Sequence, residues 1–336
     1  MILVTGGTGL VGSHLLYHLS KQNANIRAIY RTEASLQKVK QVFSYYTSDV
    51  KLFSKIKWFK ADITDVPSMK PAFAKITQVY HCAALISFHP KDYREMRKVN
   101  IHGTAILVNL AIDAGVSKFC YVSSIAAIGD AKIGQEFIDE TCEWNKEQDN
   151  SGYSITKFGA EMEVWRASQE GVDVIIVNPG VILGSGFWST GSGKLFSQVH
   201  DGFNYYTEGI TGFVSVQDVV KVMVQLMHST LKNERFILVA ENKTYKDIFF
   251  AIADAFGKKR PTKKIKPWQT EILWRFSWLV SKINGIAPLL SKYSARSAHT
   301  TSKYSSQKIK QALDCDFETI ESCIKSTCEN FTKTKA

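Results

Sequence analysis

The sequence lacks any run of about 18 apolar residues, the length that a membrane-spanning helix needs. It also lacks the leader of a secreted protein, because residues 1–4 are already apolar and partly β-branched, like a buried strand. We therefore expect no transmembrane segment, no cleaved signal and a cytoplasmic location.

Closely spaced cysteine pairs are missing as well. None of the cysteines forms a C-x-x-C pair, the spacing typical of metal sites and redox motifs, and two lie in apparent strands. We expect reduced thiols and no metal site. The chain also shows no nucleic-acid-binding module, internal repeat or low-complexity segment, so nucleic acid is not an expected partner.

Acidic residues are scarce in the last quarter of the chain. From Gly257 to the end there are 16 Lys and Arg but 6 Asp and Glu, which accounts for nearly all of the formal net charge of +11. Such an excess can attract anionic substrates, nucleic acid or an anionic membrane surface. A solvated basic face is the simpler interpretation.

Glycines, in contrast, are placed with a pattern near the start. Gly6, Gly9 and Gly12 stand between the first apolar stretch and a segment with helical apolar spacing. In such a strand, turn and helix, the first glycine permits the tight turn, the second admits a pyrophosphate and the third lets the helix pack closely. The phosphates would lie at the helix N-terminus, where free N–H groups favour anions. The pattern predicts a dinucleotide site that includes Thr5, Gly6, Thr8, Gly9, Leu10, Val11 and Gly12.

The residues after the second and third apparent strands bear on which dinucleotide binds. Arg31 ends the strand at 25–30, and Lys38 follows seven residues later; a basic residue there accommodates the 2′-phosphate of NADP. We therefore expect NADP(H), with NAD(H) as the alternative if Arg31 is only a surface residue. Asp62, with Ile63, ends a strand at 56–63 and either accepts from the adenine amino group or caps the helix that follows.

The fourth apparent strand, at 79–84, ends in Cys82, Ala83 and Ala84, which are small enough for a cofactor to lie close. We interpret His81 in this strand as a packed histidine. The loop at 88–90 is expected at the mouth of the site, with His89 as a candidate substrate contact. Asn100, near the start of an apolar helix, either bonds the backbone or holds a water in a proton relay.

The chemistry is expected from Ser124, Tyr153 and Lys157. Ser124 ends the fifth strand, and Tyr153 and Lys157 are four residues apart on one helical face. A phenol titrates near pH 10, so it needs a nearby positive charge to exchange protons with a carbonyl or alcohol at neutral pH. Lys157 would supply that charge, Ser124 would hold the reacting oxygen, and a nicotinamide would carry the hydride.

The alternation of strands and helices to residue 240 predicts an α/β fold with a Rossmann-type doubly wound parallel sheet. We assign residues 1–183, completed by 213–240, to this dinucleotide-binding domain. Residues 184–212, rich in glycine and aromatics, and residues 241–336 would form a smaller, mostly helical substrate-binding lobe. The aromatic-rich amphipathic segment at 272–283 would cover a substrate pocket or a dimer surface; peripheral membrane contact is the less favoured alternative.

Taken in order, these motifs resemble the extended short-chain dehydrogenases/reductases of the NAD-dependent epimerase/dehydratase superfamily. The resemblance is carried by residues 5–12, 62–63, 81–84, 100, 123–124, 153–157, 178–180 and 214–218. It implies a catalytic set of Ser124, Tyr153 and Lys157, and it implies that Pro179, Gly180 and Val181 lie against the nicotinamide. It also suggests a homodimer.

Within the superfamily, Arg31 and Lys38 resemble the dihydroflavonol-4-reductase-like enzymes, which use NADPH. Sugar-nucleotide epimerases usually carry an acidic residue in place of Arg31, and a Tyr-Gly where Ile128 and Gly129 stand here. The expected function is NADP(H)-dependent reduction of an aldehyde or ketone of a small, moderately hydrophobic substrate. The alternatives are a nucleotide-sugar epimerase or dehydratase, a 3β-hydroxysteroid-type dehydrogenase, and a non-catalytic NADP(H) sensor.

Overall fold

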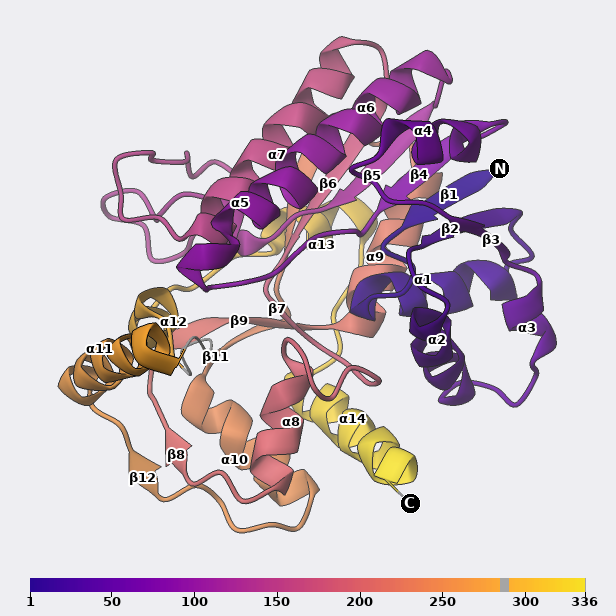
Figure 1. The fold of residues 1–336 in the computed structure, drawn as a ribbon. Helices are drawn as coiled ribbons and strands as arrows, with labels where there is room; N and C mark the ends of the chain where they lie inside the picture. The colour runs from indigo at the N-terminus through magenta and orange to yellow at the C-terminus, as the bar shows by residue number, and fades with distance from the viewer. Residues whose placement is uncertain (285–289, 336) are drawn as a thin grey trace.

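The computed structural model (Figure 1) describes residues 1–284 and 290–335, without the side chains of residues 283 and 284. Ile283, at the end of the aromatic-rich segment, therefore lies outside the described side chains. A large parallel sheet with helices on both faces forms one half of the molecule, and a smaller lobe forms the other.

The large sheet has seven parallel strands in the order β10-β6-β5-β4-β1-β2-β3. Its strands are β1 (Ile2–Thr5), β2 (Ile26–Tyr30), β3 (Lys57–Lys60), β4 (Gln78–His81), β5 (Lys118–Val122), β6 (Asp173–Pro179) and β10 (Glu234–Leu238). The predicted Rossmann-type doubly wound fold is thus confirmed. The strand order reverses between β1 and β4, which is where ligands bind in such sheets.

Side chains of each strand alternate between the two faces of the sheet, so both faces are apolar. Leu3, Val79 and Phe119 pack under the helices of one face, α4 (Val66–Met69), α6 (Gly103–Asp113) and α7 (Gly152–Gln169). Their neighbours Val4 and Tyr80 pack under those of the other, α1 (Leu10–Lys21), α2 (Ala34–Ser44), α3 (Lys51–Ser54) and α9 (Val216–His228). Figure 1 shows these two layers.

Three strand ends differ from the prediction. The third strand ends at Lys60 and the fourth at His81, so the residues expected to end them, Asp62 and Ala84, lie in loops beyond the sheet. The sixth strand runs on to Pro179, because its edge is paired with β10 up to Leu238. At the third strand, the Asp62 side chain turns the backbone by accepting from Thr64.

The lobe is built on a three-stranded sheet, β11 (Glu241–Thr244), β9 (Ile210–Ser215) and β7 (Val181–Leu183). Its core includes residues of α8 (Gly193–His200), α10 (Tyr245–Ala255) and α14 (Ile320–Lys335). The pair β8 (Tyr205–Tyr206) and β12 (Lys263–Lys264), with α11 (Pro267–Asn284) and α12 (Lys292–Ser297), lies along the left edge in Figure 1.

Two segments assigned to the lobe have unexpected roles. Residues 184–212 contain α8 and β8, and Trp188 packs within the lobe with its ring centroid 4.9 Å from that of Phe331. The helix α13 (Gln307–Leu313) leaves the lobe and packs against β10, because its apolar residue Ile309 joins the core under the large sheet. The chain therefore returns to the sheet before α14 ends it in the lobe.

Candidate active site

The turn after β1 is so close to its neighbours that only glycine fits at two positions. Gly6 has a φ of +68°, and a Cβ there would lie 2.4 Å from the backbone nitrogen of Ala83, just after β4. A Cβ on Gly12 would lie 2.2 Å from the carbonyl oxygen of Gly6. The turn thus packs tightly against the start of α1 and against Cys82 and Ala83, the residues that follow β4.

The N-terminus of α1 has the properties of a phosphate site. Its N-cap is Gly9, no side chain caps it, and its first turn contains no acidic residue. The first N–H groups of a helix have no intrahelical partner, and with the helix dipole they favour an anion. A Cβ on Gly9 would meet only the Gly6 carbonyl oxygen, at 3.4 Å, so the space over Gly9 is open on the protein side. These residues fit a dinucleotide.

His81 links this turn to the helix layer. Its Nδ1 lies 2.7 Å from the Thr5 hydroxyl, and its Nε2 lies 2.9 Å from the Thr104 hydroxyl on α6. Burial, together with the charge of Lys157, lowers the pKa of His81 to about 3, so the ring is neutral. The interpretation of His81 as a packed histidine is confirmed. The Thr5 hydroxyl is hydrogen-bonded to the His81 ring.

Arg31 and Lys38 are exposed after β2, and the charge of Arg31 acts on Asp62. Although burial acts to raise it, the pKa of Asp62 is held below its usual value by hydrogen bonds from Thr64 and by the charges of Arg31 and Lys98. Asp62 Oδ1 accepts from both the backbone N–H and the hydroxyl of Thr64, each at 2.8 Å. The cap of α4 is instead Asp65, which accepts from the Ser68 N–H.

Asn100 lies in a π-helical turn, Arg97–His102, ahead of α6. Its Oδ1 accepts from the Leu85 N–H at 2.7 Å, and its Nδ2 donates to the Leu85 carbonyl at 2.9 Å and to the Thr156 hydroxyl at 3.0 Å. Both amide protons are therefore used in holding the loop after β4 against α7. This is the backbone-bonding alternative, while a water relay at Asn100 stays a prediction.

Ser124 and Tyr153 are brought together from β5 and α7. Ser151 caps α7 by accepting from the Ser154 N–H, which places Tyr153 in the first turn of the helix. Burial raises the pKa of Tyr153 to about 12, against an opposing hydrogen bond with the Ser124 side chain. In the protein alone this is the reverse of the predicted lowering.

Lys157, one turn further along α7, is fully buried. Its Nζ donates to the Tyr121 hydroxyl at 2.6 Å and to the Val122 carbonyl at 2.8 Å. Burial lowers the pKa of Lys157 to about 7, while the nearby Glu161 carboxylate acts to raise it. The ammonium is thus directed at the end of β5, next to Ser124, rather than at the phenol.

Three polar residues of this cluster, the buried Tyr121 and Glu161 and the partly exposed Arg235, were not predicted. Tyr121 binds Lys157, and Glu161 accepts from the Asn178 side chain. The Arg235 guanidinium on β10 lies 3.7 Å from Glu161. The only available signal was spacing, since Glu161 follows Lys157 by four residues and so shares its face of α7.

Pro179, Gly180 and Val181 form the passage from the large sheet to the lobe. Pro179 ends β6, Val181 begins β7, and the Gly180 N–H donates to the Leu238 carbonyl at 3.0 Å. The Asn178 side chain, just before them, donates to the Ser124 carbonyl at 3.0 Å. This passage therefore lies beside the end of β5, while its contact with a nicotinamide stays a prediction.

A cavity of about 250 Å³ lies next to Tyr153. The Phe88 ring, one of its walls, has its centroid 5.6 Å from that of Tyr153. The predicted substrate contact His89 is on this cavity, and most other walls are apolar or aromatic. The lining residues are Ser87, Phe88, His89, Pro90, Tyr93, Met96, Asn150, Gly152, Ile155 and Tyr293.

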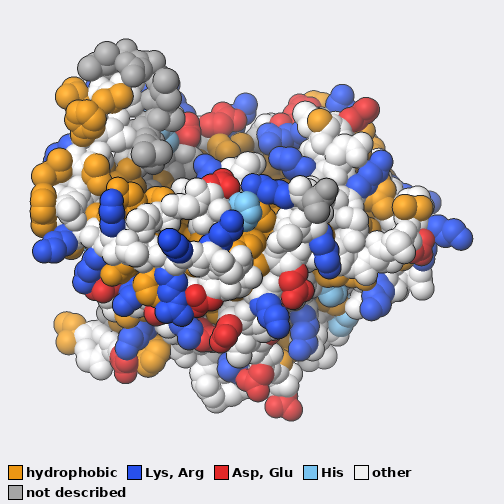
Figure 2. Space-filling model, turned by 90° about the horizontal axis from the view of Figure 1, so that it is seen from below, with side chains coloured by type: hydrophobic (Ala, Val, Ile, Leu, Met, Phe, Trp, Pro, Cys, Tyr) orange, Lys and Arg blue, Asp and Glu red, His pale blue; other side chains and the backbone are white. Residues whose placement is uncertain are grey.

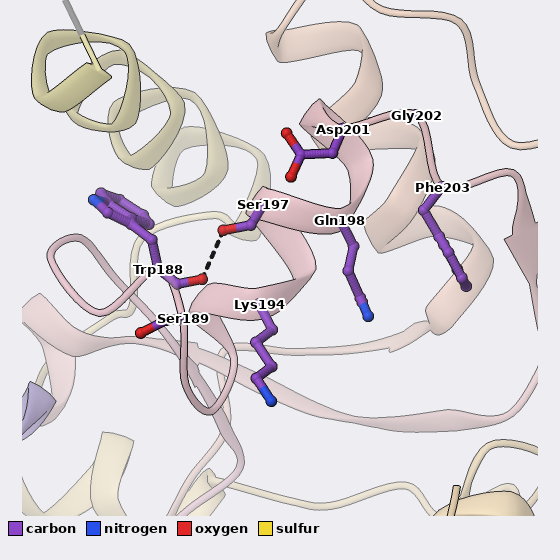
Figure 3. Close-up of a pocket in the computed structure, with 8 residues that line it drawn as sticks. All are labelled: Trp188, Ser189, Lys194, Ser197, Gln198, Asp201, Gly202 and Phe203. Atoms are coloured by element: carbon purple, nitrogen blue, oxygen red, sulfur yellow. Dashed lines mark hydrogen bonds between the residues drawn. The ribbon is translucent and has the colours of Figure 1, made fainter. Parts of the chain in front are cut away.

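A second, larger hollow of about 460 Å³ lies on the lobe (Figure 3). Its lining, which includes Trp188, Lys194 and Phe203, comes from α8 and the loops around it. The Ser197 hydroxyl donates to the Trp188 carbonyl there at 2.6 Å. This hollow shares no lining residue with the cavity beside Tyr153.

Comparison with known proteins identifies the family to which the chain belongs. A sequence model of the NAD dependent epimerase/dehydratase family matches residues 2–239. The chain is 29% identical over 271 residues to sterol demethylase protein B of Methylococcus capsulatus, covering 79% of this chain and 77% of that protein. It is 24% identical over 284 residues to the dihydroflavonol 4-reductase of Dianthus caryophyllus, covering 81% and 78%. The crystal structure of gox2253 is similar with a TM-score of 0.80 and 25% identity, covering 99% of this chain and 98% of that one.

Proposed function

Because the chain belongs to the NAD dependent epimerase/dehydratase family, and is an NAD(P)-dependent oxidoreductase of the extended short-chain dehydrogenase/reductase type, we propose that it reduces a carbonyl. The substrate would be an aldehyde or ketone of a small, moderately hydrophobic molecule. The observation that carries this proposal is the pairing of Tyr153 with Ser124 beside an apolar cavity.

The roles of the residues follow from their positions. A reduced nicotinamide cofactor bound along the glycine turn would supply the hydride. Ser124 would hold the carbonyl oxygen by a hydrogen bond. With a pKa of about 12, the Tyr153 phenol is protonated at neutral pH and can donate its proton to that oxygen. Lys157 bonds to Tyr121 and Val122 rather than to Tyr153, so its charge would support the resulting phenolate through space.

We propose NADP(H) as the preferred cofactor. Arg31, exposed directly after β2, offers a forked guanidinium to a 2′-phosphate, and Lys38 adds a second positive charge. Asp62 would then face the adenine with the oxygen that does not bind Thr64. Cys82, Ala83 and Ala84 would line the cofactor opposite the turn, and Pro179, Gly180 and Val181 would contact the nicotinamide end.

The first test is a turnover assay with NADPH and with NADH on a panel of hydrophobic aldehydes and ketones. We expect consumption of NADPH in preference to NADH. Tyr153→Phe should lower kcat by about 10²- to 10⁴-fold, the usual contribution of a positioned proton donor, with little change in cofactor affinity.

Tyr245→Phe is the matched control. It removes the hydroxyl of a partly buried tyrosine at the start of α10, in the lobe and outside the candidate site. It should keep full activity. The proposal fails if Tyr153→Phe turns over like the wild type. A clear NADH preference would overturn the role of Arg31 alone, and binding of NADPH without any turnover would favour a sensor.

A further inference from the structure

The helix α11 carries an apolar stripe that the fold leaves exposed. Trp268, Ile272 and Phe276 are spaced four residues apart and are 60%, 59% and 65% exposed, and Leu279 continues the stripe. On the other side of the helix, Thr270 is buried. Figure 2 shows hydrophobic side chains gathered along the left edge, the side on which α11 lies in Figure 1. A contiguous exposed patch of this kind marks an interaction site.

Cations border the stripe at both ends. Lys266 precedes the helix and Lys282 lies in its last turn, and both are exposed. The Lys282 Nζ lies 4.9 Å from the centroid of the Trp278 ring, itself partly exposed. The exposed Lys263 and Lys264 of β12 shortly precede the helix in the sequence, although Lys264 is paired with Glu208. The excess positive charge of the last quarter of the sequence is thus partly gathered around this stripe.

Two kinds of partner would cover such a face, a bilayer or a second copy of the chain. A symmetric dimer through α11 would bring the same lysines against each other, which is repulsive. An anionic bilayer offers lipid acyl chains to the tryptophan and phenylalanine rings and phosphates to the lysines. We propose that α11 docks lengthwise on the surface of an anionic lipid bilayer, with its apolar stripe at the boundary of headgroups and acyl chains.

Within residues 1–284 and 290–335, no helix combines the length and the hydrophobicity that crossing a bilayer requires. Docking parallel to the surface is what an amphipathic helix of this composition does. The docking helix α11 contacts α12, and α12 in turn contributes to the wall of the cavity. Arg296 on α12 pairs with Glu271 on α11 at 3.4 Å, and Tyr293 of α12 lines the cavity at Tyr153. The inference goes beyond the proposed reaction and does not depend on it.

The test is sedimentation of the full-length protein with vesicles of phosphatidylcholine alone and of phosphatidylcholine mixed with phosphatidylglycerol. We expect binding to the mixed vesicles, weakened by salt, and little binding to phosphatidylcholine alone. The double variant Trp268→Ser/Phe276→Ser and the triple variant Lys263→Gln/Lys266→Gln/Lys282→Gln should each bind at least about tenfold more weakly, because one lesion removes buried apolar area and the other removes charge.

The matched controls make the same kinds of substitution at residues outside α11 and β12. Val50→Ser/Ile133→Ser replaces two highly exposed apolar residues, and Lys21→Gln/Lys51→Gln/Lys70→Gln removes an equal charge. Both should bind like the wild type. The proposal is overturned if wild-type protein ignores the anionic vesicles or if the α11 variants bind them unchanged. It is also overturned if ultracentrifugation shows a dimer that Trp268→Ser/Phe276→Ser dissociates while the wild type does not bind vesicles.

Discussion

At the scale of single residues, the buried titratable groups decide how the protein responds to pH. His14 and His81 are both fully buried and neutral, with pKa values lowered by burial to about 4 and about 3. An unfolded chain takes up protons at these histidines below about pH 6.5, whereas the native protein does not. Protonation therefore favours unfolding as the pH falls.

We predict that the free energy of unfolding decreases from about pH 6.5 downward and that His81→Asn reduces this slope. One histidine contributes at most about 1.4 kcal/mol per pH unit to it. Urea unfolding at a series of pH values from 7 to 5 measures the slope. His228→Asn, at an exposed position, is the control and should leave the slope unchanged. An equal slope in His81→Asn and wild type would refute the role of His81.

Candidate site residues could be predicted from the sequence where they belong to a pattern of regular spacing or stand at the end of a strand. Tyr153 and Lys157 follow from helical spacing, and Ser124 from its place at a strand end. Tyr121 and Arg235 could not be predicted, because each is an ordinary strand residue until the fold places it against Lys157 or Glu161. The direction of the Tyr153 pKa shift was wrong for the protein alone, because burial raises this pKa more than the hydrogen bond with Ser124 lowers it.

At the scale of elements, two glycines of the motif between β1 and α1 serve different purposes. One allows the turn to pack, and the other leaves space for a ligand. Gly12 is needed for packing, since a Cβ there meets backbone at 2.2 Å. Gly9 has a φ of −99° and a ψ of 178°, which any residue can adopt. A Cβ placed on Gly9 would lie 3.4 Å from its nearest neighbour, the Gly6 carbonyl oxygen. Its lack of a side chain is therefore useful to a ligand rather than to the fold.

Two alanine variants test this separation. Gly12→Ala should destabilise the protein by about 1–3 kcal/mol through overpacking. Gly9→Ala should keep the melting temperature of the wild type but weaken cofactor binding at least about tenfold, because its methyl group would occupy the approach of the pyrophosphate. Thermal unfolding and cofactor fluorescence titration give the two readouts. If Gly9→Ala binds the cofactor normally, the pyrophosphate does not lie over this turn.

Most elements of the large sheet could be predicted because buried strands are apolar runs and the helices between them are amphipathic. Strand ends could not, since they depend on local bonds such as those of Asp62 with Thr64. The lobe was predicted only as helices and connectors. Its strand β7 has only three residues and β11 is mostly polar, and both are held by pairing with β9, which is distant in the sequence from β7.

At the scale of the whole molecule, Asp149 connects the loop before α7 to α12. Its carboxylate accepts from Lys292 at 2.7 Å, Arg296 at 2.8 Å and the Tyr293 hydroxyl at 3.0 Å. These hydrogen bonds hold the pKa of Asp149 below its usual value. They also hold Tyr293 at the cavity, which the sequence could not predict because Tyr93 and Tyr293, which both line it, are far apart in the chain.

We predict that Asp149→Asn raises KM several-fold with little change in kcat. The contacts are exposed, so the melting temperature should change little. Steady-state kinetics with the best carbonyl substrate of the panel measures both constants. Glu136→Gln breaks another exposed pair, with Lys303, neither of which lines the cavity, and should leave KM unchanged. A lower kcat with an unchanged KM would show that Asp149 acts on the chemistry and not on the cavity wall.

The path of the chain between the two halves has a consequence for how such an enzyme can change. After β6 the backbone enters the lobe, goes back for α9 and β10, leaves again, and returns once more as α13 before α14 closes the lobe's core. Neither half is therefore formed by one continuous segment of the chain. New substrate preferences in this architecture must therefore arise by replacing residues in place, because grafting a foreign lobe would sever the strands and helices that complete the sheet.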